Sequence, residues 1–310
     1  MSVRAASHVL LIAPRDYRGN AETAESNVFQ RSVGDDELAR LAVVAIEQHR
    51  ALRNLLVENG IRITVTRALP TTPDAPFCNN WFSTHPVGPT GSPTLVLYPM
   101  LAPSRRLERR EDLVAMLRSW YPHTVDLTER EQAGHFLEST GSLCLDDQAR
   151  VAYAAISPRT DRSLAETWAR SLGYRLVAFQ ATDDGNVPYY HTNVMMFLGH
   201  GLAGVCLESL PERAADGLAS RADVEASLTA AGLEIVPITR AQVLAYCGNC
   251  LPLVTDDGEP VLVMSSTAWR GFAAGERARL SARARILHTE LTAFETLGGG
   301  SARCLLGELF

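Results

Sequence analysis

The sequence predicts a single α/β domain, and two observations lead to this fold class. Short apolar runs typical of buried strands alternate with amphipathic stretches typical of helices along the whole chain. No low-complexity linker interrupts the alternation, so residues 1–310 are interpreted as one domain. The composition agrees, because 46% hydrophobic and 21% charged residues suit a chain that buries a sizeable core.

The expected strands are short runs of aliphatic and β-branched residues. They are His8–Ala13, Ile61–Thr66, Thr94–Tyr98, Arg175–Phe179, Leu202–Leu207, Glu234–Ile238 and Pro260–Ser265. No internal repeat is visible among them. Their spacing permits a ring of small αβ units without requiring one.

The expected helices have apolar residues three and four positions apart. The clearest is Glu37–Asn59, with Gly60 after it as a stop signal. A second helix follows the capping residues Thr160 and Asp161 and ends before Gly173. The expected helices after the first are Arg162–Leu172, Arg221–Ala231 and Ala274–Thr292.

Charge and hydropathy exclude two classes of partner. The formal net charge is −6, so no broad basic field is present to bind nucleic acid. No apolar run approaches the roughly 20 residues that a membrane-spanning helix needs. The first run, His8–Ala13, ends at Pro14 without a small-residue cleavage pattern, so it indicates a strand rather than a signal peptide. We expect a cytoplasmic protein, and the sequence leaves open whether it forms a homo-oligomer.

The cysteines do not indicate a disulfide scaffold in a cytoplasmic chain of this length. They are Cys78, Cys144, Cys206, Cys247, Cys250 and Cys304. Cys247 and Cys250 form one CxxC pair, but no second Cys or His pair stands at the spacing of a zinc site. We therefore expect no metal. A redox role is also disfavoured, since the pair lacks the strand–CxxC–helix context of thioredoxin-like proteins. The chain has no lysine, which removes lysine as a Schiff base or general base.

Two polar segments in the first half of the chain have both a functional and a structural interpretation. In residues 73–85, Asn79 and Asn80 beside aromatic residues suit a pocket wall, or simply a turn. In residues 136–142, Glu138 precedes small residues, and it either points into a cleft or is exposed in a loop.

Two further segments lie in the second half. His191 begins an apolar run and suits proton transfer near neutral pH, although a lone histidine is often a hydrogen-bonded core residue. Residues 298–300 are three glycines that let backbone approach a ligand closely. They lead to Cys304 beside Arg303, which favours a thiolate; the alternative is a buried cysteine in a tail. One Cys, one His and one Glu in separate segments fit nucleophilic catalysis.

These segments carry a resemblance to a known family. The sequence resembles the guanidino-group-modifying superfamily, also called amidinotransferase or pentein, which contains arginine deiminases, dimethylarginine dimethylaminohydrolases and amidinotransferases. It looks most similar to the branch of citrulline-utilisation hydrolases. Six segments carry the resemblance in order along nearly the whole chain: Asn20-x-x-Thr23-Ala24-x-x-Asn27-x-Phe29-Gln30, Asp74–His85, Tyr98-Pro99-Met100 with Arg105–Arg110, Glu138-x-Thr140-Gly141-Ser142, His191-Thr192-Asn193 and Gly298–Cys304.

The resemblance implies a fold and a set of site residues. The fold is a pentein-type α/β propeller, with five pseudo-symmetric αβ modules around a central active site. Cys304 matches the family nucleophile, His191 the catalytic histidine and Glu138 the active-site glutamate. The substrate-binding positions implied are Asp74, Asn79, Asn80, Arg105 and Arg106, with one of the two arginines expected to hold a substrate carboxylate. No cofactor is expected, since the nucleophile and the base are both side chains.

The chain departs from its relatives at two positions. Those that bind guanidinium commonly have acids where this chain has Asn80 and Asn193. A guanidinium cation favours paired carboxylates, whereas an amide offers a donor and an acceptor to a neutral ureido group. This predicts a cysteine-dependent hydrolase of a ureido amino acid, with citrulline giving ornithine, ammonia and carbon dioxide.

The alternatives belong to two classes. Within the same superfamily they are an arginine deiminase or dimethylarginine dimethylaminohydrolase producing citrulline, and an amidinotransferase. A non-catalytic binding protein on the same fold is the other class. The presence of Cys304, His191 and Glu138 together disfavours it.

Overall fold

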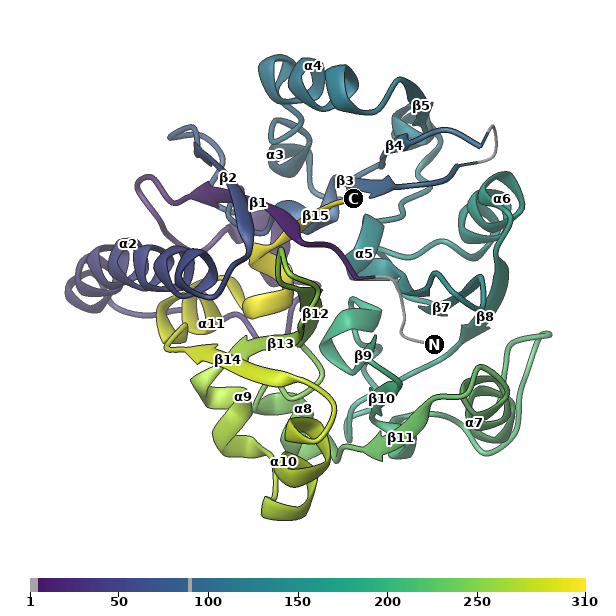
Figure 1. The fold of residues 1–310 in the computed structure, drawn as a ribbon. Helices are drawn as coiled ribbons and strands as arrows, with labels where there is room; N and C mark the ends of the chain where they lie inside the picture. The colour runs from purple at the N-terminus through teal and green to yellow at the C-terminus, as the bar shows by residue number, and fades with distance from the viewer. Residues whose placement is uncertain (1–4, 89–90) are drawn as a thin grey trace.

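The computed structural model describes residues 5–88 and 91–310, and their strands form five three-stranded sheets. Figure 1 shows the sheets arranged around a common centre, with most of the longer helices on the periphery. The ring of five αβ modules implied by the family resemblance is therefore confirmed, although the sequence itself shows no repeat.

Four of the modules share one topology, in which the middle strand pairs antiparallel with the strand before it and parallel with the strand after it. Helical segments connect the two parallel strands, as a parallel crossover requires. The strands are β3 (Phe82–His85), β4 (Thr94–Leu97) and β5 (His123–Asp126); β6 (Cys144–Asp146), β7 (Val151–Ala155) and β8 (Arg175–Phe179); β9 (Met196–Gly199), β10 (Leu202–Val205) and β11 (Glu234–Pro237); and β12 (Leu251–Val254), β13 (Pro260–Ser265) and β14 (Arg285–Thr289). The connecting helices are α3 (Pro103–Arg106) and α4 (Glu111–Trp120), α6 (Arg162–Leu172), α7 (Arg221–Ala230), and α9 (Ser266–Gly271) and α10 (Ala274–Ser281).

The fifth module is completed by the two ends of the chain. Strand β1 (His8–Ala13) pairs in parallel with β2 (Arg62–Arg67), and α2 (Asp35–Glu58) connects them. Strand β15 (Gly307–Leu309) adds antiparallel to β1, with His8 opposite Leu309. This pairing closes the ring, and Figure 1 shows β15 near its centre. Cys304 lies in the short turn directly before β15.

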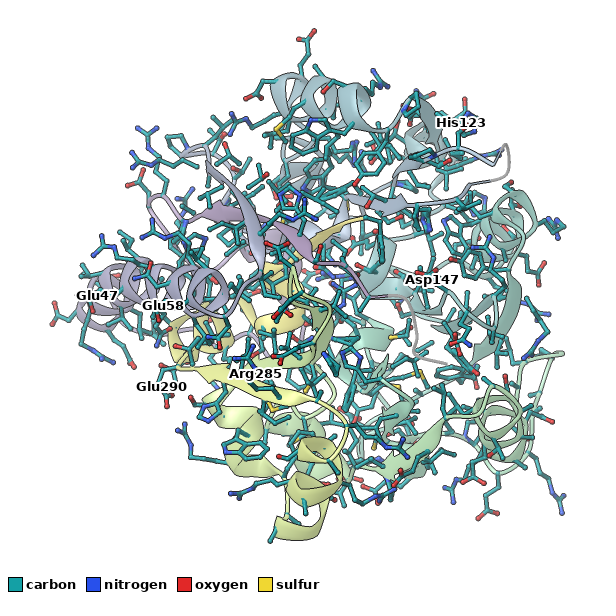
Figure 2. All side chains as sticks on the ribbon, viewed as in Figure 1. Glu47, Glu58, His123, Asp147, Arg285 and Glu290 are labelled. Atoms are coloured by element: carbon teal, nitrogen blue, oxygen red, sulfur yellow. The ribbon has the colours of Figure 1, made fainter. Side chains whose placement is uncertain are left out.

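Three of the expected helices, α2, α6 and α7, form within a few residues of their predicted bounds. Helix α2 buries Leu41 and Leu52 and presents Glu47 and Glu58 at the outer surface (Figure 2). Helix α6 has the predicted bounds: the Asp161 carboxylate accepts the Leu164 N–H at 2.8 Å, and Gly173 ends the helix with a φ of 72°. These caps satisfy backbone groups that the first and last turns leave unpaired.

The prediction of one long helix over Ala274–Thr292 is wrong. Helix α10 ends at Ser281, and Arg285–Thr289 instead form β14, which pairs in parallel with β13 so that Leu262 lies opposite Ile286. The arginine-rich composition suits a helix. The open edge of β13 offers hydrogen bonds to a second strand, however, and this tertiary pairing overrides local propensity.

A short turn precedes the first strand of the modules and places side chains at the centre of the ring. Four of these turns are η1 (Cys78–Asn80), α5 (Ser139–Ser142), η3 (Thr192–Val194) and η5 (Ala302–Leu305). The segment Cys247–Cys250 has the same place before β12. Because the turns are equivalent in a closed ring, residues distant in sequence converge there. The remaining short helical segments are α1 (Ala21–Ala24), η2 (Thr128–Ala133), η4 (Leu207–Ser209), α8 (Arg240–Leu244) and α11 (Thr292–Gly298).

Within residues 5–88 and 91–310, none of the helices has the length and apolar character needed to cross a bilayer.

Candidate active site

A small pocket at the centre of the ring contains many of the predicted site residues. Its lining is Thr23, Asn27, Asp74, Phe77, Asn80, Arg105, Arg159, Tyr190, His191, Gly298, Gly300 and Cys304. Glu138 contacts His191 of this lining, and Asn193 contacts Cys304. Asn79 hydrogen-bonds to Thr140 beside the pocket. Arg106 does not line the pocket.

His191 and Glu138 form a buried hydrogen-bonded pair. His191 Nε2 lies 2.8 Å from Glu138 Oε2, and both side chains are at most 2% exposed. Burial lowers the pKa of His191 below its usual value, and the Glu138 carboxylate only partly offsets this effect. His191 is therefore neutral near pH 7. It donates Nε2–H to Glu138, which leaves Nδ1 free to accept a proton.

Glu138 keeps its charge although it is fully buried. Burial alone would raise its pKa, but Arg159 at 3.5 Å, the hydrogen bond with His191 and Arg105 at 4.0 Å together lower the pKa to about 2. The Leu101 N–H also donates to Oε1 at 3.0 Å. An ionised Glu138 fixes the His191 ring and stabilises its protonated form when His191 takes up a proton.

The sulfur of Cys304 receives two amide donors. Asn249 Nδ2 lies 3.3 Å from Sγ, and Asn193 Nδ2 lies 3.7 Å away. Burial raises the pKa of the Cys304 thiol, while the Asn249 hydrogen bond acts in the opposite direction. The guanidinium of Arg303, which the sequence suggested as the activating group, instead binds Glu308 at 2.7 Å and the Leu306 carbonyl.

Arg105 fixes the orientation of the Asn80 side chain. Its Nη1 donates to Asn80 Oδ1 at 2.8 Å, while Nε and Nη2 bind the Glu108 carboxylate and Nη2 also binds the Phe77 carbonyl. Since an arginine can only donate, the oxygen of Asn80 must face Arg105. The Asn80 NH₂ group faces the opposite way, beside Gly141 and His191, and has no hydrogen-bond partner in the described structure.

Three further buried oxygens at the centre lack a partner among the described residues. They are Asp74 Oδ1, Asn79 Oδ1 and Asn193 Oδ1. Asp74 Oδ2, by contrast, accepts hydrogen bonds from Asn20 at 2.9 Å and Thr23 at 3.2 Å. A buried polar atom without a partner costs free energy, so an unpaired set at one site indicates groups that a ligand satisfies.

The pocket arginine that sequence reasoning missed is Arg159. Its Nε and Nη2 hold Ser26 and the Thr23 carbonyl, and its guanidinium stacks on Tyr190 with 4.9 Å to the ring centre. Nη1 makes no hydrogen bond within the described residues. Arg106 is engaged elsewhere, with the Met100 and Leu101 carbonyls. No sequence signal distinguished Arg159 from other arginines.

Asn249 is the second residue that sequence reasoning missed. Asn249 lies inside the CxxC segment, where the two cysteines are the more conspicuous residues. The one sequence feature that could have indicated Asn249 is its position just before a strand, which it shares with Asn193. Both cysteines are buried free thiols, and burial raises their pKa. In the described ranges, no group of three or more His, Cys, Asp or Glu side chains is placed to hold a metal ion.

The three glycines serve packing as well as the pocket. A Cβ atom on Gly298 or Gly300 would meet the Phe77 ring at 2.3 and 2.7 Å, distances that real Cβ atoms do not show. Gly299 has a φ of 63° and lies against Asn27, whose side chain donates to the Gly298 carbonyl at 2.9 Å. Contacts with Phe77 and Asn27 thus hold residues 298–300, just before Cys304, in place.

The ring of five modules and the central pocket define a pentein-type enzyme, and comparison with known proteins identifies the family. The family model for eukaryotic-type N,N-dimethylarginine dimethylhydrolases matches residues 13–310. The chain therefore belongs to this family of hydrolases, which act on guanidino C–N bonds. A comparison with curated proteins gives no match.

Solved structures support the same fold. The N-terminal domain of ArgZ, an arginine dihydrolase from the ornithine–ammonia cycle in cyanobacteria, was solved with its substrate. It is 16% identical and has a TM-score of 0.71 over 97% of each chain. AgrE in complex with L-arginine is 17% identical with a TM-score of 0.74, and this chain spans 40% of its length. A dimethylarginine dimethylaminohydrolase adduct with S-methyl-L-thiocitrulline is 14% identical with a TM-score of 0.65. At identities this low, the structural similarity shows a shared fold and no more.

Proposed function

We propose that this protein hydrolyses citrulline to ornithine, ammonia and carbon dioxide through a covalent intermediate on Cys304. The observation that carries this proposal is the orientation of Asn80. Its oxygen is taken by Arg105, so its NH₂ group is the side that faces the centre. That NH₂ group can only donate a hydrogen bond.

The donor at Asn80 discriminates between the two kinds of planar substrate group. The ureido group of citrulline has a carbonyl oxygen that accepts the Asn80 N–H. A guanidinium group has only N–H donors, so it would leave the Asn80 donor unmatched and place it against positive charge. The open oxygen of Asn193 then accepts a ureido N–H on the other side.

The open groups of the pocket also suit the amino-acid end of the substrate. Asp74 Oδ1 is an unpaired acceptor for the α-ammonium group. Arg159 Nη1 forms an ion pair with Glu138 at 3.5 Å, and this pocket guanidinium is the cationic donor for the α-carboxylate. We infer that Arg159, rather than Arg106, binds this carboxylate. Arg105 is a positioning residue for Asn80, because nearly all of its N–H groups are already bonded.

The chemistry follows from the residue types. The Cys304 thiol passes its proton to His191, and the thiolate attacks the ureido carbon. The terminal nitrogen then leaves as ammonia with that proton, which gives a thiocarbamate. His191 then takes a proton from water, whose oxygen attacks the same carbon and releases the thiolate. The resulting N-carboxy-ornithine loses carbon dioxide to give ornithine. Glu138 stabilises His191 whenever it is protonated.

The second candidate is hydrolysis of arginine or a methylated arginine. It is favoured by the ionised Glu138, by the unpaired oxygen of Asp74, and by structural neighbours that hold L-arginine or act as arginine dihydrolases. A cationic substrate would also help to ionise the buried Cys304 thiol. This candidate requires the Asn80 amide to tolerate a guanidinium.

The deciding experiment supplies the purified protein separately with citrulline, arginine and methylated arginines. Products are identified by mass spectrometry and ammonia is assayed in parallel, with Cys304→Ala as the control. We expect ornithine from citrulline, absent in the variant. Citrulline formed from an arginine compound, with no turnover of citrulline itself, would replace the first candidate by the second.

A further inference from the structure

The side chain of Asn249 makes hydrogen bonds that connect Cys304 to a neighbouring module. Its Nδ2 donates to Cys304 Sγ at 3.3 Å and to the Asn193 carbonyl at 3.0 Å. Its Oδ1 accepts the Arg303 N–H at 3.1 Å. The side chain is fully buried, and among residues 5–88 and 91–310 these groups are its hydrogen-bond partners.

The three bonds fix the orientation of the amide. The backbone N–H of Arg303 binds the amide oxygen of Asn249, and the backbone carbonyl of Asn193 binds its amide nitrogen. The oxygen and the nitrogen of this amide therefore cannot exchange places without losing both hydrogen bonds. The remaining N–H of Nδ2 is therefore held toward the sulfur. A donor of this kind stabilises a thiolate more than a thiol, because charge-assisted hydrogen bonds are the stronger ones.

The other charged and titratable groups near Cys304 do not replace this donor. Arg303 is paired with Glu308, and Arg105 is paired with Glu108. The remaining groups that act on the sulfur or share its pocket are Tyr17, Asp74, Arg159, Tyr190, His191 and Tyr246. A neutral substrate adds no positive charge, so the sulfur depends on donors of the protein itself.

We propose that Asn249 is a positioning residue for the reaction, and that its amide N–H stabilises the thiolate form in which the Cys304 sulfur attacks. This rests on the proposed function only in taking Cys304 as the nucleophile. The Asn193 amide is the weaker partner, because it lies farther from the sulfur and has an oxygen left open for substrate.

The test measures the thiolate of Cys304 directly. Alkylation by iodoacetamide is followed from pH 6 to pH 11 in the wild type, in Asn249→Asp and in Asn249→Ala, with Cys304→Ala to correct for the other cysteines. The aspartate keeps the size and the acceptor for Arg303 but loses the donor, and the alanine removes both. Asn54→Asp, the same change at an exposed site on α2, is the matched control.

We expect the pH midpoint of alkylation to rise by about one unit or more in both Asn249 variants, with an unchanged midpoint in Asn54→Asp. At pH 7 this corresponds to alkylation about tenfold slower. Midpoints equal to that of the wild type, in variants whose circular dichroism is unchanged, would overturn the proposal and leave Asn249 a structural residue. Because alkylation uses no substrate, either result stands whether or not citrulline is turned over.

Discussion

Nη1 of Arg105 donates a 2.8 Å hydrogen bond to Oδ1 of Asn80, and this bond determines what the pocket presents to a planar substrate group. Arg105 is itself held by Glu108, whose carboxylate is fully buried. Burial raises the pKa of Glu108 to about 7, although Arg105 opposes this. The Asn80 amide is therefore oriented by a chain of buried polar contacts that begins outside the pocket.

Replacing Asn80 by Asp is expected to reverse the substrate preference. A carboxylate would keep the bond to Arg105 and offer its second oxygen to a guanidinium, while it would repel a ureido carbonyl. The ratio of kcat/KM for citrulline to that for arginine should fall by about tenfold or more. Asn54→Asp is the control for an added charge. An unchanged ratio would contradict the role given to Asn80.

Replacing Glu138 by Gln should remove most of the activity. The neutral amide leaves Arg159 without its buried counter-ion and no longer stabilises protonated His191. We expect kcat to fall by about 100-fold or more, in the range of lost acid–base catalysis. Glu129→Gln, at an exposed position, should have no such effect. A loss confined to KM would mean that Glu138 binds substrate without assisting His191.

The activity on a neutral substrate should be nearly independent of pH between the pKa of His191 and that of Cys304. Burial lowers the pKa of His191 and raises that of Cys304, so near pH 7 the resting pair is a neutral imidazole and a thiol. The reacting pair, a protonated His191 and a thiolate, carries the same number of protons, so its fraction stays constant between the two pKa values. We expect kcat/KM for citrulline to change by less than about twofold from pH 6 to pH 8. A rise of about tenfold per pH unit would show that the thiolate reacts without a proton from His191.

Substitution of Arg159 should affect substrate binding more than substitution of Arg106. Loss of a charged hydrogen bond to the substrate carboxylate is expected to raise KM in Arg159→Met by about tenfold, or roughly 1.4 kcal/mol. In Arg106→Met, whose guanidinium binds backbone carbonyls, KM should change by less than about twofold. Equal KM values in the two variants would leave the carboxylate without an assigned partner.

Acid should destabilise the fold through its buried histidines. Burial lowers the pKa of His85 to about 3, and His85 makes a 2.9 Å hydrogen bond with Ser83 Oγ. Between pH 6.5 and pH 3 the unfolded chain binds a proton at His85 that the folded chain does not, so the free energy of unfolding falls as the pH falls. From pH 7 to pH 5 the loss is about 2 kcal/mol for this residue. Urea unfolding at both pH values should show a smaller loss in His85→Gln, and an equal loss would disprove this assignment.

The sequence alone was informative where the signal is local. The caps and apolar spacing of residues 162–172 define helix α6 at both ends, because capping and periodicity depend on residues a few positions apart. The segments holding Glu138, His191 and Cys304 could also be selected from the sequence, since polar residues beside apolar runs are visible without a structure. Their assembly into one pocket was implied only by the family resemblance.

The tertiary structure decided what depends on partners distant in the chain. Residues 285–289 form a strand because β13 lies beside them, and β15 exists because it pairs with β1 at the other end of the chain. The same holds for the site, where Asn249 contacts Cys304 and His191 contacts Glu138 across module boundaries. These hydrogen bonds join segments that are more than fifty residues apart, so they produce no local or periodic pattern in the sequence. The types of the site residues could therefore be predicted from the sequence, but the orientations of their side chains could not.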